Sequence, residues 1–415
     1  MKIAAFLGKL VRHGNIVLET ADGIAHRLGD RAGPLIGVKL TDKAAEFELL
    51  MNPALTFGEL FMEGRLVVTH GTLYDVIECG ARNLAEVSSL PWVEAVNKFR
   101  IAFRGVHQRN GRRRAKKNIS HHYDLDANFY RMFLDQDMQY SCAYFEHEDD
   151  SLEQAQLAKK RHIVAKMLLD DNHSVLDIGC GFGGMALYCA GVAGARSTGV
   201  TLSDEQLHVA NQRAAVSGVR DRLDFRLQDY RDVRETFDRI VSVGMFEHVG
   251  VARYDEYFHG VKRLLKEDGV ALIHSIGRNS VPSATNPWIR KYIFPGGYIP
   301  SLSEVLPAIE RAGLYVTDIE ILRLHYADTL REWRRRFMAH RDEVKKIYDE
   351  RFCRMWEFYL AGSESSFRVD GHMVMQIQIA KRQETVPLTR DYIREREEAL
   401  RRRETALRPV RHAAE

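Results

Sequence analysis

The chain has 415 residues, enough for two domains or for one large domain with appendages. Its formal net charge is only +3, so the composition gives no sign of a protein that binds nucleic acid through bulk charge. The five cysteines form neither a Cys-x-x-Cys pair nor a spaced Cys/His cluster, which argues against a zinc site or a disulfide framework and favours a reducing compartment. No apolar run approaches the ~20 residues of a membrane span, so we expect a cytoplasmic protein that can still dock on a membrane.

Residues 1–104 predict a small separate domain that mixes helix and strand. Strand-like runs lie at 16–18 and 35–40, and a helical segment extends from Thr72 to Leu90. A basic stretch at 105–119 follows, and its cations are Arg109, Arg112, Arg113, Arg114, Lys116 and Lys117. This stretch is either a solvated linker or a strip that attracts anionic lipid headgroups, with each charge worth ~1 kcal/mol near such a surface.

Strand and helix patterns alternate over most of the remaining chain. A capping box of Ser151 and Gln154 opens a predicted helix that extends to Leu169. Strands are predicted at 174–178, 196–201, 223–227, 238–243 and 269–276, with further strand patterns at 315–324 and 373–380. Segments at about 279–300 and 327–366 read as helical or irregular insertions of the kind that cover a substrate pocket, and 386–415 as a charged helical tail. This order predicts an α/β fold with a doubly wound, mostly parallel sheet.

The stretch from Ser174 to Gly184 organises the predicted sheet. It reads Ser-Val-Leu-Asp-Ile-Gly-Cys-Gly-Phe-Gly-Gly, a buried strand followed by a turn rich in glycine. A helix begins at Met185, so its free N–H groups and the positive end of its dipole face the same place. Strand, glycine turn and helix N-terminus together predict a small-molecule cofactor site at the carboxyl edge of the sheet.

The glycines alone do not decide which cofactor binds, because Gly179, Gly181 and Gly184 also satisfy the G-x-G-x-x-G dinucleotide pattern. An NAD site favours an acidic residue ~20 positions further on, for the ribose hydroxyl. The second strand, 197–201, ends in threonine instead. A Leu-Asp-Ile-Gly-Cys-Gly turn is much more typical of enzymes that use S-adenosylmethionine (SAM), so SAM is our first prediction. A nicotinamide site and a glycine turn without a ligand stay open as alternatives.

Several motifs, in chain order, resemble one specific family. They are Met138-Gln-Tyr-Ser-Cys-Ala-Tyr144, Val175-Leu-Asp-Ile-Gly-Cys-Gly181, Gly199-Val-Thr-Leu-Ser203, Leu227-Gln-Asp-Tyr-Arg231, Val243-Gly-Met-Phe-Glu-His-Val-Gly250 and Tyr292-Ile-Phe-Pro-Gly296. Phe57-Gly-Glu-Leu-Phe-Met-Glu-Gly-Arg65 adds a match near the N-terminus. The chain resembles the cyclopropane-fatty-acyl-phospholipid synthases, which add a methylene group from SAM across a cis double bond in membrane lipid chains.

The resemblance implies an organisation in four parts. We expect a small N-terminal α+β domain at 1–104, a basic linker at 105–119, a SAM-dependent catalytic domain at 120–385 and a charged helical tail at 386–415. The catalytic domain is expected to have the seven-stranded, Rossmann-like sheet of SAM methyltransferases, with a helical substrate cap.

The resemblance also implies partners and a location. The expected substrates are unsaturated acyl chains of membrane phospholipids, reached by a cytoplasmic protein that associates peripherally with the inner membrane surface. A homodimer is a further expectation of the family. Alternatives left open are a SAM-dependent methyltransferase that makes methyl-branched fatty acids or methylates another acceptor, and a non-catalytic SAM- or lipid-binding relative.

The family's base is a bound bicarbonate ion rather than a side chain. Its ligands carry over to Cys142, Glu247, His274, Ile276 (through its backbone) and Tyr326. In this scheme Glu247 accepts a hydrogen bond from the bicarbonate hydroxyl, while His274 and Tyr326 donate to its oxygens. The alternative interpretations are structural: a glutamate that caps a helix, a core histidine, a packing tyrosine and a small buried cysteine.

The SAM-binding residues implied by the resemblance come from five segments. They are Tyr140, Ser141, Asp177, Gly179, Cys180, Gly181, Gly183, Thr201, Leu202, Gln206, Asp229 and Tyr230, and no metal ligand is expected. Two of them have a structural alternative. Gln206 could close a capping box with Ser203, and Asp229 could be a turn residue at the end of a strand.

Overall fold

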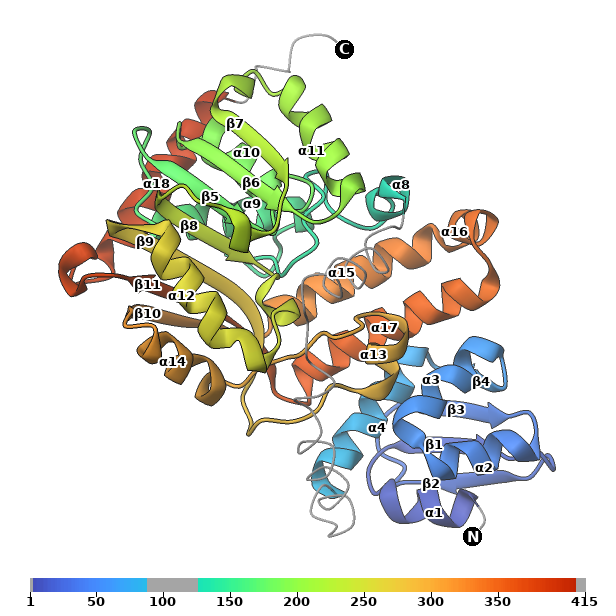
Figure 1. Cartoon of the computed structure of the whole chain (residues 1–415). Coiled ribbons are helices and arrows are strands. Elements are labelled where there is room, and N and C mark those ends of the chain that lie inside the picture. The colour runs from blue at the N-terminus through green and yellow to red at the C-terminus, as the bar shows by residue number, and fades with distance from the viewer. Residues whose placement is uncertain (1–2, 88–125, 408–415) are drawn as a thin grey trace. The chain divides into compact units, whose positions relative to one another are not determined.

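The computed structural model describes residues 3–87 and 126–407. These residues form two compact units (Figure 1): the first comprises 3–87, 282–297 and 326–372, and the second comprises 126–281, 298–325 and 373–407. The basic stretch at 105–119 and the predicted domain boundaries on either side of it lie outside the described residues. The domain limits drawn from the sequence therefore stay predictions.

The first unit is built around a four-stranded sheet with the order β2-β1-β3-β4. The strands are β1 (Asn15–Glu19), β2 (Ala25–Leu28), β3 (Leu35–Leu40) and β4 (Leu66–His70). The helices are α1 (Ile3–Leu10) before them, α2 (Lys43–Met51) and α3 (Pro53–Glu63) between β3 and β4, and α4 (Leu73–Val87) after β4. The strand-like runs at 16–18 and 35–40 are strands, as expected. The short β2 and β4 were not predicted, since each has only one buried residue and lacks a clear alternation.

Two insertions from later in the chain belong to this first unit. Their helices are α13 (Pro287–Tyr292), α15 (His325–Ala339, from Tyr326 onward), α16 (Arg341–Ile347) and α17 (Glu350–Arg368). Phe358 of α17 packs its ring 5.7 Å from that of Phe57 on α3 and 4.5 Å from that of Trp288 on α13. Ala361 is fully buried in the same apolar core as the first sheet. The insertions therefore share a hydrophobic core with the N-terminal residues.

The second unit contains a seven-stranded sheet with the order β10-β11-β9-β8-β5-β6-β7. Its strands are β5 (Ser174–Ile178), β6 (Arg196–Thr201), β7 (Leu223–Leu227), β8 (Phe237–Val243), β9 (Leu265–Arg278), β10 (Tyr315–Leu322) and β11 (His372–Ala380). The pairs β5–β6, β5–β8, β6–β7 and β8–β9 are parallel, while β10 and β11 are antiparallel. All seven strands coincide with predicted runs, and the predicted fold class is confirmed.

Helices cover both faces of this sheet because its central strands are buried on both sides (Figure 1). Val175 packs in a core with α9 (Leu152–Lys166), α10 (Gly184–Gly191) and α18 (Asp391–Leu407). Leu176, the next residue, points to the other face, where α12 (Tyr254–Leu264) and α14 (Leu302–Arg311) pack. The short α8 (Ala127–Arg131) and α11 (Asp204–Ala215) complete the unit. No helix in the described part of the chain has both the length and the apolarity to cross a membrane.

The tail helix α18 is fixed to α9 by buried polar contacts as well as by apolar packing. The predicted capping box of Ser151 and Gln154 opens α9, as expected. Arg161 of α9 donates to Glu404 of α18 at 2.8 Å. The hydroxyl of Tyr188, on α10, donates to the same carboxylate at 2.5 Å. The charged tail is thus part of the fold of the second unit, which its sequence pattern did not indicate.

Replacing Glu404 should weaken this attachment. The change Glu404→Ala leaves the buried guanidinium of Arg161 with only Glu146 and deprives the hydroxyl of Tyr188 of its acceptor. We expect the local opening of α18 to become easier by about 3 kcal/mol, which corresponds to roughly 100-fold faster amide hydrogen exchange within 391–407. Hydrogen exchange measured by mass spectrometry checks this.

The matched control is Glu398→Ala on the same helix. Glu398 pairs with Arg394 at an exposed position, where such pairs contribute about 0.3–0.5 kcal/mol. Equal protection of α18 in wild-type protein and Glu404→Ala would show that the buried pair does not hold the tail helix.

Candidate functional site

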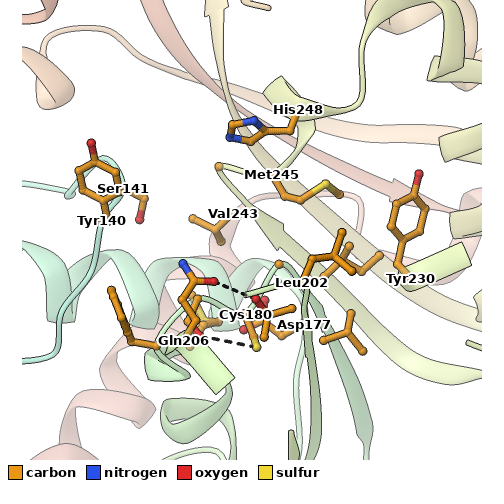
Figure 2. A pocket seen from close by; sticks show the side chains of 18 of the residues that line it. Tyr140, Ser141, Asp177, Cys180, Leu202, Gln206, Tyr230, Val243, Met245 and His248 are labelled. Atoms are coloured by element: carbon orange, nitrogen blue, oxygen red, sulfur yellow. Dashed lines mark hydrogen bonds between the residues drawn. The ribbon is translucent and has the colours of Figure 1, made fainter. Parts of the chain in front are cut away.

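A pocket lies at the carboxyl edge of the seven-stranded sheet, where the glycine turn follows β5 (Figure 2). Its wall combines the residues that follow β5, β6, β7 and β8 with the segment 138–141. In Figure 2, Tyr140 and Ser141 lie on one side of the pocket and Tyr230 lies on the other. Because parallel strands all end at one edge of a sheet, loops that are distant in sequence meet at this place.

The glycine turn shapes the floor of the pocket. Gly179 and Gly181 have positive φ angles of +81° and +53°, which residues with a side chain rarely adopt. A Cβ atom on Gly179 would lie 2.9 Å from the Cβ of Met245, so this glycine is required by packing. A Cβ on Gly181 would meet no described atom within 4 Å. Gly181 therefore leaves space in which a ligand can approach the backbone.

All but one of the predicted cofactor residues line this pocket. They are Tyr140, Ser141, Asp177, Gly179, Cys180, Gly181, Thr201, Leu202, Gln206, Asp229 and Tyr230. The exception is Gly183, which is the N-cap of α10 and packs against Phe225 and Ala210. A Cβ there would lie 2.8 Å from the Phe225 ring, so the structure explains this glycine by close packing of helix against strand.

Gln206 takes part in the helix cap only through its backbone. Its N–H donates to Ser203 Oγ at 3.3 Å, which is half of the expected capping box. The side chain does not return to the N–H of Ser203; its Oε1 instead accepts from Thr201 Oγ1 at 2.8 Å. Thr201 Oγ1 accepts from the N–H of Ser203 in turn. The amide of Gln206 is thereby held in the pocket wall.

Asp229 is both a turn residue and part of the pocket. It caps the short helical turn Tyr230–Asp232 by accepting from the N–H of Arg231 at 3.0 Å. The guanidinium of Arg231 also donates to the Asp229 carboxylate, with distances of 2.8 and 2.5 Å. The charge of Asp229 is therefore already paired within the protein.

Asp177 has a different environment, because one of its carboxylate oxygens is buried without a hydrogen-bond partner in the described structure. Oδ2 has no hydrogen-bond partner among the described residues. Burial raises the pKa of this carboxyl to about 7, with partial compensation from the nearby positive charge of Lys159. A buried acceptor at the end of β5 is suited to a ligand that brings a positive charge or an N–H group.

Lys159 of α9 supports the opposite wall of the pocket. Its ammonium is completely buried and donates to Gln139 Oε1 and Ser141 Oγ, each at 2.7 Å. Burial lowers the pKa of Lys159 to about 8. The lysine thus fixes the side chain of Ser141 from behind and places a positive charge near Asp177.

Part of the pocket wall, after β8, consists of residues that were not predicted from the sequence. Met245 and His248 line the pocket, and burial lowers the pKa of His248 to about 4, so that its imidazole is neutral at pH 7. Arg253 and Gln228 also line it. The signal was present, since Met245 and His248 directly follow a predicted strand at the edge where ligands bind. From that segment, the predicted site residues include Glu247 but neither Met245 nor His248.

None of the five predicted catalytic residues is among the described residues that line this pocket. Glu247 sits in the short turn Phe246–His248 after β8, and its Oε1 accepts from the N–H of Ile276 on β9 at 2.7 Å. Its other oxygen, Oε2, is buried without a partner in the described structure, and burial raises the pKa of the carboxyl to about 7. His274 is almost fully buried on β9, and its Nε2 also finds no partner within the described ranges.

Strand register relates His274 to Asp177. Asp177 pairs with Val241 on β8, and Val241 pairs with Leu272 on β9. His274 is therefore two strands across, about 10 Å, and two residues, about 7 Å, further toward the carboxyl edge. Alternation puts both side chains on the face covered by α9, because Val175 and Leu272 pack there. Glu247 accepts a hydrogen bond from the N–H of Ile276, which is two residues beyond His274 on β9.

The other predicted catalytic residues have different settings. Cys142 is buried in the second unit. The backbone of Ile276 is already engaged, because its N–H donates to Glu247 and its carbonyl accepts from Ser275 Oγ at 3.1 Å. Tyr326 lies on α15 in the first unit, with its ring 4.8 Å from that of Phe367. The catalytic assignments of all five residues stay predictions.

Comparison with known proteins identifies the family. The family model described as mycolic acid cyclopropane synthetase matches residues 110–377. Over 366 residues, the chain is 37% identical to the cyclopropane-fatty-acyl-phospholipid synthase of Escherichia coli K12, a match that covers 86% of this chain and 93% of that protein. The chain belongs to the cyclopropane synthase family. The family and the enzyme class predicted from its motifs are confirmed.

Two other relatives bear on the chemistry of the family. A protein of Mycobacterium tuberculosis named tuberculostearic acid methyltransferase UfaA1 is 35% identical to this synthase-family chain, and the match covers 88% of each. The crystal structure of mycolic acid cyclopropane synthase CmaA1 complexed with SAH and CTAB is 33% identical, with a TM-score of 0.60. That match covers 64% of this chain and 97% of the other.

The unusual carboxyl of Asp177 can be tested directly. In protein labelled with ¹³C at the aspartate carboxyl carbons, the signal lost in Asp177→Asn should titrate near pH 7. A positively charged ligand binds the ionised carboxylate more tightly than the neutral acid, so its affinity should rise as the pH rises through 7. Binding should in turn lower the pKa of Asp177.

Asp238 is the internal reference for this titration. Against its partial burial, hydrogen bonds from Ser174 and Lys266 lower the pKa of Asp238 to about 2. If the Asp177 signal titrates together with ordinary exposed aspartates, near pH 4, then Oδ2 is in contact with water and is not a buried acceptor without a partner.

Proposed function

We propose that this enzyme adds a methylene group from SAM across the cis double bond of unsaturated acyl chains in membrane phospholipids, with a bound bicarbonate as the general base. One observation carries the proposal. Beside the glycine-turn pocket, Glu247 and His274 each keep one buried polar atom that no described group fills. Glu247 follows β8, and His274 lies on the neighbouring strand β9. Glu247 accepts a hydrogen bond from the N–H of Ile276, two residues beyond His274 on β9.

The residues of the pocket fit SAM. The unfilled Oδ2 of Asp177 offers a buried acceptor to a cationic or N–H group, and Gly181 leaves open space beside the backbone. The first turn of α10 contributes free N–H groups that favour a carboxylate. The related synthase whose structure holds SAH supports this assignment. When bound, SAM supplies an electrophilic methyl group.

The pair formed by Glu247 and His274 fits a small anion that has both a hydroxyl group and acceptor oxygens. Glu247 Oε2 can accept from the hydroxyl, and an N–H of His274 can donate to an oxygen. Bicarbonate supplies a base at this place, where a methyl group newly added to an alkene has to lose a proton before the ring closes. The further proposed ligands of bicarbonate are Cys142, Ile276 and Tyr326. Because the N–H of Ile276 donates to Glu247, Ile276 would act on the anion through Glu247.

The surroundings of Glu247 exclude water. The ring of Phe246 is fully buried and stacks on that of Tyr254 at 4.5 Å and packs against that of Tyr257 at 5.1 Å. His248, on the other side of Glu247, is kept neutral by burial. A dry and mostly apolar environment strengthens every hydrogen bond to an anion and suits the reaction of an unactivated alkene, which has no polar group to bind.

The same site could serve a second reaction, the methylation of an unsaturated acyl chain without ring closure. The relative named tuberculostearic acid methyltransferase favours this candidate, since it matches 88% of this chain. Both reactions require loss of a proton after methyl transfer, so a base held by Glu247 and His274 would serve either one. The two reactions give different products from the same substrate.

Incubation with labelled SAM and vesicles of an unsaturated phospholipid tests the reaction. We expect acyl chains that gain one CH₂ and lose the double bond, with turnover that depends on added bicarbonate. A methylene-branched product has the same mass but keeps a double bond, so proton NMR of the ring CH₂ distinguishes the two. Glu247→Gln removes the proposed acceptor for the bicarbonate hydroxyl and should lower turnover at least about 100-fold, because a base that is no longer held in position typically loses that much.

Glu267→Gln provides the control for this substitution. Glu267 is 77% exposed and pairs with Lys381, far from the sheet edge that holds the pocket, and its loss should leave turnover unchanged. Methylated product with a retained double bond would favour the second reaction. Full turnover in buffer stripped of bicarbonate would overturn the proposed base while leaving the SAM pocket in place.

Access to lipid acyl chains requires contact with a bilayer, and we propose peripheral docking through the basic stretch at 105–119. Neutralising Arg112, Arg113 and Arg114 together should weaken binding to vesicles of anionic phospholipid at low salt, with each charge worth ~1 kcal/mol. Sedimentation with vesicles measures this, and vesicles of neutral lipid are the reference. Unchanged binding would exclude the basic stretch. A homodimer stays an expectation drawn from the family.

A further inference from the structure

A chain of buried polar side chains lies behind His274, and the proposed reaction makes no direct use of it. Gln376 Nε2 on β11 is 3.3 Å from His274 Nδ1, and Gln376 Oε1 accepts from Lys166 Nζ at 3.2 Å. Gln376 and the Lys166 side chain are completely buried. Lys166 of α9, Gln376 of β11 and His274 of β9 therefore form one row of hydrogen-bonded side chains.

The chemistry of lysine fixes the direction of this row. An ammonium group has three donors and no acceptor, so the atom of Gln376 that faces Lys166 has to be the amide oxygen. The amide NH₂ then faces His274 and donates to Nδ1. A ring nitrogen that accepts a hydrogen bond carries no proton. In a neutral imidazole the proton is consequently on Nε2, the atom that no described group satisfies.

Lys166 is itself held in place by carboxylates. Its ammonium lies 2.9 Å from Glu320 Oε2 and 3.5 Å from Asp318 Oδ2, both on β10. The same Glu320 oxygen contacts His162 Nε2 at 2.6 Å. A fully buried ammonium is strongly unfavourable without such partners. These contacts hold the Lys166 ammonium against Gln376.

We propose that Lys166 and Gln376 are positioning residues that hold His274 as the neutral tautomer with its proton on Nε2, so that this N–H donates to the base anion. The role of the anion rests on the proposed function, but the tautomer does not. His274 Nε2–H and Glu247 Oε2 then form one buried donor and one buried acceptor. Bicarbonate has oxygens for the donor and a hydroxyl for the acceptor.

Two further observations agree with this arrangement. Burial, together with the positive charges of Lys159 and Lys166, holds the pKa of His274 well below its usual value, so that the ring is neutral. With the opposite tautomer, Nδ1–H and the NH₂ group of Gln376 would place two donors against each other at 3.3 Å. Reversal of the amide is prevented because its NH₂ would then face an ammonium.

The test measures the tautomer by NMR of protein labelled with ¹⁵N at the histidine ring nitrogens, with the His274 signals assigned by their loss in His274→Asn. In wild-type protein we expect an Nε2–H tautomer. Gln376→Glu replaces the NH₂ donor by an acceptor of the same shape, so the ring should now carry a proton on Nδ1. The bicarbonate concentration for half-maximal turnover should rise about 10-fold or more, because a hydrogen bond to a charged group contributes about 1.5–3 kcal/mol, while the KM for SAM changes little.

Gln378→Glu is the matched control. Gln378 is also fully buried on β11, two residues further along the same face, and it contacts the carbonyl oxygen of Lys166 and the hydroxyl of Tyr392 rather than His274. This variant introduces the same buried charge, and the tautomer and the bicarbonate dependence should stay as in wild-type protein. Equal effects of the two substitutions would show that the row is only a structural network.

The wild-type spectrum decides the proposal even if Gln376→Glu does not fold. A proton on Nδ1 of His274 in wild-type protein would overturn it, and so would an unchanged tautomer in a folded Gln376→Glu. Turnover that is independent of bicarbonate would instead contradict the proposed base alone, because the tautomer measurement needs neither substrate nor activity.

Discussion

Burial of positive charge on α9 is the constraint on which much of the second unit depends. Five side chains of this helix are almost completely inaccessible: Lys159, Lys160, Arg161, His162 and Lys166. Each buried charge has to find a partner, and the partners come from separate parts of the chain: the segment before the glycine turn, the edge strand β10 and the tail helix α18. The interactions of one helix thus place the wall of the pocket, the edge of the sheet and the end of the described chain.

The fold of the second unit was predictable because its physical causes are local. Central strands of a parallel sheet are buried on both faces and read as short apolar runs, as at 174–178 and 269–276. Glycines with positive φ mark the turn after β5. The resemblance implied Asp177, Thr201 and Asp229 as cofactor residues, and the structure brings them to one pocket because they lie at or just after the carboxyl ends of parallel strands. These features depend on a few neighbouring residues and survive in the sequence.

The remaining features depend on contacts between distant residues. The helix α9 is buried almost all round, and its run of cations is buried with it, whereas the charged residues of a surface helix usually face solvent. Gly183 is a predicted cofactor residue, and the structure places the ring of Phe225 in the space beside it, which its sequence segment does not reveal. The sharing of a core between Phe57 and Phe358 could not be read from either segment alone. Each of these required knowledge of the partner.

Buried ion pairs contribute little to stability compared with well-packed apolar residues, so their presence on α9 calls for another reason. Lys159 and Lys166 are seven residues apart, which is about 10 Å along a helix and comparable with the two strand spacings between β5 and β9. Lys159 holds the pocket wall near Asp177, and Lys166 orients the amide that contacts His274. An apolar α9 could pack against the same sheet, but it could neither orient a glutamine amide nor select a histidine tautomer. The two lysines therefore place one fixed positive charge behind each half of the site.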